Sequence, residues 1–143
     1  MKLFRKKKKS TPPLLFWVDV GCAVIRCKGK ILISRRKIDS HQGGLWEFPG
    51  GKRLGGESLG TCLEREIWEE LGIRIQTVRF LMRIDHAYPD KAVSLYFYEC
   101  RLMAGTPQAR GCLEWRWAAP FELKHYPFPP ADVKILSYLT LLQ

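Results

Sequence analysis

A glycine-rich turn runs directly into an acidic segment of helical periodicity in residues 50–73, GGKRLGGESLGTCLEREIWEELGI. Apolar residues recur there at the spacing of one helix face, which predicts an amphipathic helix over residues 59–71. Ser58 or Thr61 can cap the start of this helix, and Gly72 is well placed to end it. The apolar face must be buried against another element. It consists of Leu59, Cys62, Leu63, Ile67 and Leu71.

Three carboxylates share another face of this helix. Glu66 and Glu70 are one turn apart, and Glu69 lies three residues after Glu66, so all three project away from the apolar stripe. Like charges at these spacings cost about 0.2–0.5 kcal/mol per pair. Mg²⁺ or Mn²⁺ would turn that cost into coordination, because hard divalent ions prefer carboxylate oxygens. The pattern therefore favours a divalent-metal site over a solvated helix face.

Neighbouring residues extend this acidic cluster. Arg65 lies four residues before Glu69 and can orient it. Glu57 precedes the helix, where the turn at 55–56 can fold its side chain back towards the carboxylates. The backbone at Gly50 and Gly51 lacks Cβ atoms, so it can approach the site closely and offer a free carbonyl as a further oxygen ligand.

Strand-like segments surround the helix. Runs rich in Val, Ile and aromatic residues, bounded by turn residues, predict β-strands, and a second helical pattern covers residues 132–142. Together these elements predict an α/β domain of layered architecture with a mixed sheet. The predicted strands are 16–25, 30–35, 46–48 (ending at Pro49-Gly50-Gly51), 74–85, 91–102 and 113–118.

Basic residues concentrate at the N-terminus. The 143-residue chain carries a net charge of +10, and its first nine positions hold six of the 24 Lys and Arg residues. We expect residues 1–15 to form a disordered, solubilising arm, with a nucleic-acid- or lipid-binding arm as the alternative, and residues 16–143 to form one domain. Asp19 interrupts the apolar run after Pro12-Pro13, which argues against a signal peptide, and no run is long enough to span a bilayer.

The five cysteines are odd in number and form no C-x-x-C pair. Zinc ribbons and disulfide frameworks are therefore disfavoured, and reduced thiols are expected. This predicts a cytoplasmic protein.

The spacing of glycine and glutamate also matches a known motif. Residues 51–73 fill every specified position of the Nudix box, G-x5-E-x7-R-E-U-x-E-E-x-G-U, where U is a bulky apolar residue. LWEFPGGK around its start, SRR at 34–36 and FPPAD at 128–132 resemble the MutT branch of the Nudix hydrolases, so the resemblance runs from Val18 to the C-terminus. The box positions are held by Gly51, Glu57, Arg65, Glu66, Ile67, Glu69, Glu70, Gly72 and Ile73.

The resemblance implies an α/β/α sandwich with a mixed sheet. It also implies an enzyme that hydrolyses nucleoside triphosphates, often oxidised purine ones, to monophosphate and pyrophosphate. Mg²⁺ is the implied cofactor, and Mn²⁺ can substitute. In the implied mechanism Glu66 or Glu69 takes the proton of the attacking water, and Arg65 supports these carboxylates. The implied metal ligands are the Gly50 carbonyl, Glu66, Glu69 and Glu70, with Glu57 in support.

Arg36, and also Arg35, can hold phosphate oxygens, because a guanidinium matches phosphate geometry. The alternative is an exposed strand end with solvated charges.

One position departs from the family pattern. The family often places an acid six residues before a tryptophan of the late strand, and counting back from Trp117 reaches Gly111. Glu114 is the nearest acid and is the candidate for a displaced role, with a surface position as the alternative.

The resemblance places Phe48, Tyr88 and Asp132 around the nucleotide base. The bacterial prototype has Asn where this chain has Asp132. An ionised Asp only accepts hydrogen bonds, which suits the N1–H and N2–H₂ edge of guanine, and a buried, protonated Asp regains a donor. The alternatives are that Asp132 caps the last helix and that Tyr88 packs only within its loop.

The first expected function is Mg²⁺-dependent hydrolysis of 8-oxo-dGTP in nucleotide-pool sanitation. Alternative substrates are CTP, a methylated pyrimidine triphosphate and RNA 5′ ends, the last favoured by the basic arm. A different class of function is a non-catalytic lesion-binding module like the C-terminal domain of adenine glycosylases, which predicts an eroded box and an attached glycosylase domain. The sequence leaves the oligomeric state open.

Overall fold

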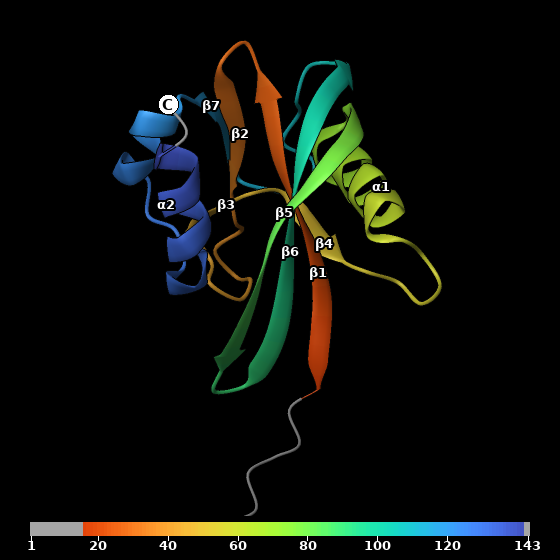
Figure 1. The fold of residues 1–143 in the computed structure, drawn as a ribbon, viewed down its shortest axis with the longest axis vertical. Coiled ribbons are helices and arrows are strands. Elements are labelled where there is room, and N and C mark those ends of the chain that lie inside the picture. Colours follow the sequence, from red (N-terminus) through yellow and green to blue (C-terminus); the bar gives the residue numbers. More distant parts are fainter. Residues whose placement is uncertain (1–15, 142–143) are drawn as a thin grey trace, which may run out of the picture.

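The computed structural model describes residues 16–141 (Figure 1). The predicted basic arm, residues 1–15, lies outside the described residues. In chain order the elements are β1 (Trp17–Cys27), β2 (Lys30–Arg35), β3 (Trp46–Glu47), β4 (Gly50–Lys52), α1 (Leu59–Leu71), β5 (Arg74–Tyr88), β6 (Lys91–Ala104), β7 (Glu114–Ala118), the 3₁₀ turns η1 (Pro120–His125) and η2 (Pro130–Asp132), and α2 (Val133–Leu141).

Strand β1 is the centre of the sheet. It pairs in parallel with β6 from Trp17↔Ala92 to Arg26↔Arg101, and it pairs antiparallel with β2 and with β4. The strand order is β3-β2-β1-β6-β5, with β4 on β1 and β7 on β2. The sheet is therefore mixed, as predicted.

Helices cover both faces of the sheet, with α1 on one side and α2 on the other (Figure 1). Alternate residues of β1 serve the two sides, because successive side chains of a strand point to opposite faces. Ala23 and Ile25 belong to the core under α1, whereas Cys22 and Val24 belong to the core under α2. The predicted α/β/α sandwich is confirmed. From the helices, Leu63, Ile67 and Leu71 fill the first core, and Ile135 and Leu139 fill the second.

Helix α1 begins and ends where the sequence predicts. The Ser58 side chain accepts a hydrogen bond from the Thr61 N–H at 3.1 Å, so Ser58 and not Thr61 is the cap. Gly72 adopts the left-handed conformation at φ 66° that ends many helices. Local capping signals therefore fix both ends of the helix that carries the acidic cluster.

Other boundaries differ from the prediction. The hairpin strands β5 and β6 extend to Tyr88 and Ala104, because each gives the other hydrogen-bonded partners beyond the apolar runs. Residues 50–52 form strand β4 where a turn was expected, since their backbone pairs with β1. The helix predicted to start at Asp132 starts at Val133, and the 3₁₀ turn η1 at 120–125 was not predicted.

All five cysteines lie within the described residues and are free thiols. In the part of the chain that the structure describes, no helix has the length and apolarity to cross a membrane.

We expect Ile67→Ala to lower the free energy of unfolding by about 2–5 kcal/mol, because Ile67 has no exposed surface and its loss leaves a cavity between α1 and the sheet. Urea unfolding followed by circular dichroism measures this change. Glu64→Ala on the exposed side of the same helix is the control and should change the value by less than about 0.5 kcal/mol. Equal effects of the two substitutions would contradict the assigned core.

Candidate active site

Strand β4 brings two glycines close to α1. Gly51 pairs with Gly21 of β1, and a Cβ atom added at Gly51 would lie 2.4 Å from the Glu66 Cδ. The Glu66 carboxylate therefore lies directly against the Gly51 backbone. A Cβ atom at Gly50 would lie 1.8 Å from the Gly21 carbonyl oxygen. Only glycines allow β4 to pass between β1 and the acidic face of α1.

Arg65 contacts three of the predicted carboxylates. Its Nε and Nη2 donate to the two oxygens of Glu57 at 3.1 and 2.6 Å, and its Nη1 donates to Glu66 at 2.8 Å. The contact with Glu69, the one predicted from sequence, is the longest at 3.4 Å. Hydrogen bonds from Arg65 lower the pKa of Glu57 to about 2, with help from the Leu54 N–H. In this structure hydrogen bonds to Glu57 fix the Arg65 guanidinium, and a hydrogen bond from Arg65 in turn fixes the Glu66 carboxylate.

Glu70 lies apart from Arg65 and among other carboxylates. Burial, together with the charges of Glu47 and Glu66, raises the pKa of its carboxyl group to about 8, and the Gly50 N–H opposes the shift by donating to it. A buried carboxylate beside two others is costly unless a cation neutralises it. Its surroundings therefore fit a hard divalent ion, for which carboxylate and carbonyl oxygens are the preferred ligands.

The side chains of the candidate metal ligands do not point towards one common position in this structure. Among residues 16–141, no three carboxylate, imidazole or thiolate groups are placed to hold a single ion together. Arg65 contacts Glu66 and Glu69 instead. A divalent ion bound here would take carboxylate oxygens that the guanidinium now contacts.

The four residues expected to bind substrate surround one pocket, which opens beside the two glycines. Arg36, Phe48, Tyr88 and Asp132 all line it. Phe48 is buried and packs at 5.2 Å between ring centroids on Phe128. Tyr88 reaches the pocket from the end of β5 and meets the His41 ring edge-on at 4.7 Å. The pocket therefore joins aromatic surface to a small set of polar groups, as nucleotide sites do.

Arg36 is anchored within the protein. Its Nε donates to the His41 carbonyl at 2.6 Å and its Nη1 donates to Glu47 at 2.5 Å. Arg35 likewise donates to the Gly44 carbonyl at 2.8 Å. The alternative of a free strand end with solvated charges is therefore wrong for both arginines. Arg36 balances the charge of Glu47 at the pocket wall.

Asp132 faces the pocket with only 6% of its surface exposed. Burial, together with the charge of Glu47, raises the pKa of its carboxyl group to about 7, and Arg36 opposes the shift. It is the last residue of the turn η2, and α2 begins at the next residue. Within the described residues no hydrogen bond from a helix N–H reaches its carboxylate, so the helix-cap alternative is wrong.

The NUDIX domain family model matches residues 21–138. The chain belongs to the Nudix hydrolase family. This confirms the interpretation of the box and makes the chain an enzyme that acts on nucleotide pyrophosphate bonds.

Individual Nudix relatives place it near MutT. The CTP pyrophosphohydrolase of Escherichia coli K12 is 34% identical over 126 residues, covering 88% of this chain and 93% of the relative. The 8-oxo-dGTP diphosphatase of the same organism is 29% identical over 126 residues, covering 87% and 98%. The solution structure of the E. coli ORF135 protein has a TM-score of 0.76 at 33% identity, covering 90% of this chain and 91% of that one. The predicted MutT-like branch is confirmed.

The late acid of the Nudix pattern has no counterpart here. Gly111 lies in the segment between β6 and β7, and residues 106–112 contain no acidic residue. The Glu114 carboxylate lies on β7 and pairs with Arg35 at 3.5 Å and with Arg116 at 3.2 Å. The Glu114 carboxylate is therefore already paired with two arginines.

Sequence reasoning missed four polar residues that line the pocket, His41, Gln42, Glu47 and Lys91. Glu47 lies in the two-residue strand β3 beside buried Trp46, and strand alternation could have placed its side chain on the opposite face. His41 lies in the loop before β3, where its Nε2 is buried and has no hydrogen-bond partner within the described residues. Its Nδ1 lies 4.0 Å from Asp90. No local pattern indicated that His41 would reach the pocket.

Proposed function

We propose that this Nudix hydrolase is a Mg²⁺-dependent nucleoside triphosphate pyrophosphohydrolase that removes oxidised purine nucleotides such as 8-oxo-dGTP from the nucleotide pool. One observation supports this most. The acidic face of α1, with Glu66 against Gly51 and Glu70 beside Gly50, adjoins the pocket that holds Phe48 and Asp132. A triphosphate and its base therefore have adjacent places to bind.

The proposed metal ligands are those implied by the box: Glu66, Glu69 and Glu70 with the Gly50 carbonyl, and Glu57 in support. When bound, Mg²⁺ would neutralise phosphate charge and acidify a water. Glu66 or Glu69 then accepts the water's proton while the water oxygen attacks phosphorus. The bond between the α and β phosphates breaks, giving nucleoside monophosphate and pyrophosphate.

Arg65 has a positioning role in this scheme. Its bonds to Glu57 fix the guanidinium, and its bond to Glu66 aims that carboxylate. Arg36 contributes positive charge at the pocket wall, where phosphate oxygens can approach it.

The base is assigned to the pocket lined by Phe48, Tyr88 and Asp132. Ionised Asp132 offers two acceptors, which match the N1–H and N2–H₂ donors of a guanine edge. Phe48 and Tyr88 supply aromatic surface for the base. This combination favours a guanine nucleotide, with 8-oxo-dGTP first among them.

A second candidate is CTP or a methylated pyrimidine triphosphate. The similarity to a CTP pyrophosphohydrolase favours it. Protonated Asp132 presents one donor and one acceptor, which match N3 and the amino group of cytosine. RNA 5′ ends are a third substrate class, for which the basic arm at 1–15 would supply nucleic-acid contacts. The complete box argues against a non-catalytic lesion-binding module.

We also propose that the enzyme works in the cytoplasm. Five free cysteines suit a reducing compartment.

A pyrophosphate-release assay over a nucleotide panel with Mg²⁺ tests the proposal. We expect 8-oxo-dGTP to exceed dGTP in kcat/KM by about tenfold or more, because the proposed specificity requires polar groups of the pocket to bond the N7–H and the C8 oxygen that dGTP lacks. Glu70→Gln is the control for contaminating activity. Preference for CTP over 8-oxo-dGTP would select the second candidate, and no release from any nucleotide would overturn the assigned activity.

A further inference from the structure

The segment between β6 and β7 closes over the C-terminal end of α1. The Gln108 N–H donates to the Leu71 carbonyl at 2.8 Å, and the N–H groups of Arg110 and Gly111 both donate to the Glu70 carbonyl at 3.0 Å. The last carbonyls of a helix have no partner within it, so these bonds fix the final turn of α1. We call the residues that donate them, within 108–111, the helix-end clamp.

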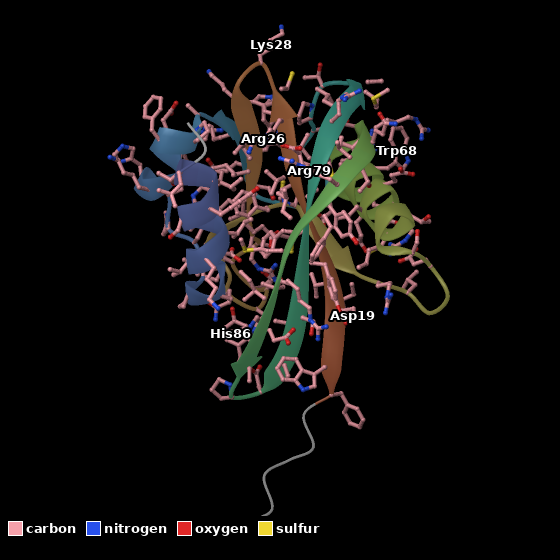
Figure 2. The ribbon with its side chains drawn as sticks, viewed as in Figure 1. Asp19, Arg26, Lys28, Trp68, Arg79 and His86 are labelled. Carbon is pink, nitrogen blue, oxygen red and sulfur yellow. The ribbon has the colours of Figure 1, made fainter. Side chains whose placement is uncertain are left out.

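The Arg110 side chain strengthens the helix-end clamp. Its guanidinium lies against Gly72, where an added Cβ atom would be 2.8 Å from Cζ. It also lies 5.5 Å from the centre of the Trp68 ring, and Arg74 of β5 lies 4.4 Å from the same ring. Figure 2 shows Trp68 at the outer side of α1, towards its C-terminal end. The clamp therefore contacts the helix through the Arg110 side chain as well as through backbone hydrogen bonds.

Gly111 brings the clamp into direct contact with Glu70. A Cβ atom at position 111 would lie 3.1 Å from the Glu70 Cγ and 3.3 Å from its Cα. Gly111 is not among the residues with positive φ. A side chain at this position would therefore be tight against Glu70, which would have to shift by a few tenths of an ångström, whereas the backbone conformation itself does not require glycine.

We propose that the helix-end clamp positions the Glu70 carboxylate for metal binding, and that Gly111 is glycine because any side chain would displace Glu70. This inference rests on the proposed function, since it takes Glu70 as a metal ligand. The Glu70 backbone is held by the clamp, and its carboxylate meets the Gly50 N–H.

Gly111→Ala tests the role of the clamp. We expect Mn²⁺ to bind about tenfold more weakly, as measured by electron paramagnetic resonance of free Mn²⁺ without nucleotide, because groups that orient a metal ligand affect affinity on this scale. The kcat for the preferred triphosphate should fall in parallel. Gly60→Ala is the matched control on the same helix, since its Cβ would make an ordinary 3.6 Å contact with the Thr77 hydroxyl. It should bind Mn²⁺ like the wild type.

Three further variants separate the possible failures. If Glu70→Gln binds Mn²⁺ like the wild type, the metal assignment of the proposed function is wrong. If Glu70→Gln binds weakly but folded Gly111→Ala binds normally, only the clamp inference is overturned. If Gly111→Ala does not fold, Arg110→Ala decides, with several-fold weaker Mn²⁺ binding expected and Arg74→Ala as its control. If Arg110→Ala and Arg74→Ala both bind Mn²⁺ with the affinity of the wild type, the inference is also overturned.

Discussion

Replacing either Glu70 or Glu66 with glutamine is expected to lower kcat for pyrophosphate release by about 10³-fold or more. Each change removes an anionic oxygen ligand from the proposed metal site, whose ion would neutralise phosphate charge in the transition state. The fold should persist, because both side chains lie away from the apolar stripe of α1 and glutamine keeps their size. For Glu70 the change also removes a buried charge that Glu47 and Glu66 repel.

The measurement is kcat with saturating Mg²⁺ and nucleotide, together with the thermal unfolding midpoint of each variant. Glu64→Gln is the matched control, because Glu64 is exposed on the same helix and makes no ion pair within the described residues. Wild-type turnover by both Glu66→Gln and Glu70→Gln would remove these residues from the metal site.

Asp132→Asn is expected to change which base the enzyme prefers and to remove a pH dependence from that preference. The folded-state pKa of Asp132 is raised to about 7, so its carboxyl group ionises as the pH rises through neutrality. The ionised form accepts two hydrogen bonds from a guanine edge, and the protonated form matches cytosine. In the wild type, the kcat/KM ratio of 8-oxo-dGTP to CTP should therefore rise about tenfold between pH 6 and pH 8.

In Asp132→Asn the same ratio should stay constant over this pH range, because the amide does not titrate. Taking the ratio of two substrates cancels ionisations that affect both, including those of the metal-binding carboxylates. The raised pKa of Asp132 also makes the stability of the fold depend on pH. A carboxyl group with a raised folded-state pKa destabilises the fold increasingly above its unfolded pKa, so Asp132→Asn should be the more stable protein at pH 8. A flat ratio in the wild type would remove Asp132 from base recognition.

The helix α1 and its cluster were predictable because their signals are local. Ser58, Gly72 and the apolar stripe specify the helix within one short segment, and the carboxylates follow from its periodicity. Contacts between distant segments were not predictable. The pairing of Arg36 with Glu47 joins the residue after β2 to strand β3, and the approach of Gly111 to Glu70 depends on the path of the segment after β6. The parallel pairing of β1 with β6 is likewise specified by no single stretch of sequence.

Asp132 is a single residue whose role could not be predicted from the local sequence for the same reason. From sequence it was equally a helix cap and a base-reading group, because both roles favour Asp after Pro129-Pro130. Asp132 lies directly before α2, where a cap would lie, but within the described residues no helix N–H donates to its carboxylate, and its side chain lines the pocket instead. Which of the two occurs depends on packing against distant segments, which no local pattern shows.

The contacts of Arg65 give the acidic helix a counter-ion of its own. Glu57, Glu66 and Glu69 share one guanidinium that belongs to the chain, so one of their three negative charges is offset without a metal. A divalent ion bound at the proposed site would replace contacts with this guanidinium, so the net free energy of binding it would be smaller than the same carboxylates without Arg65 would give. Such a site would release its ion more readily than one built from carboxylates alone.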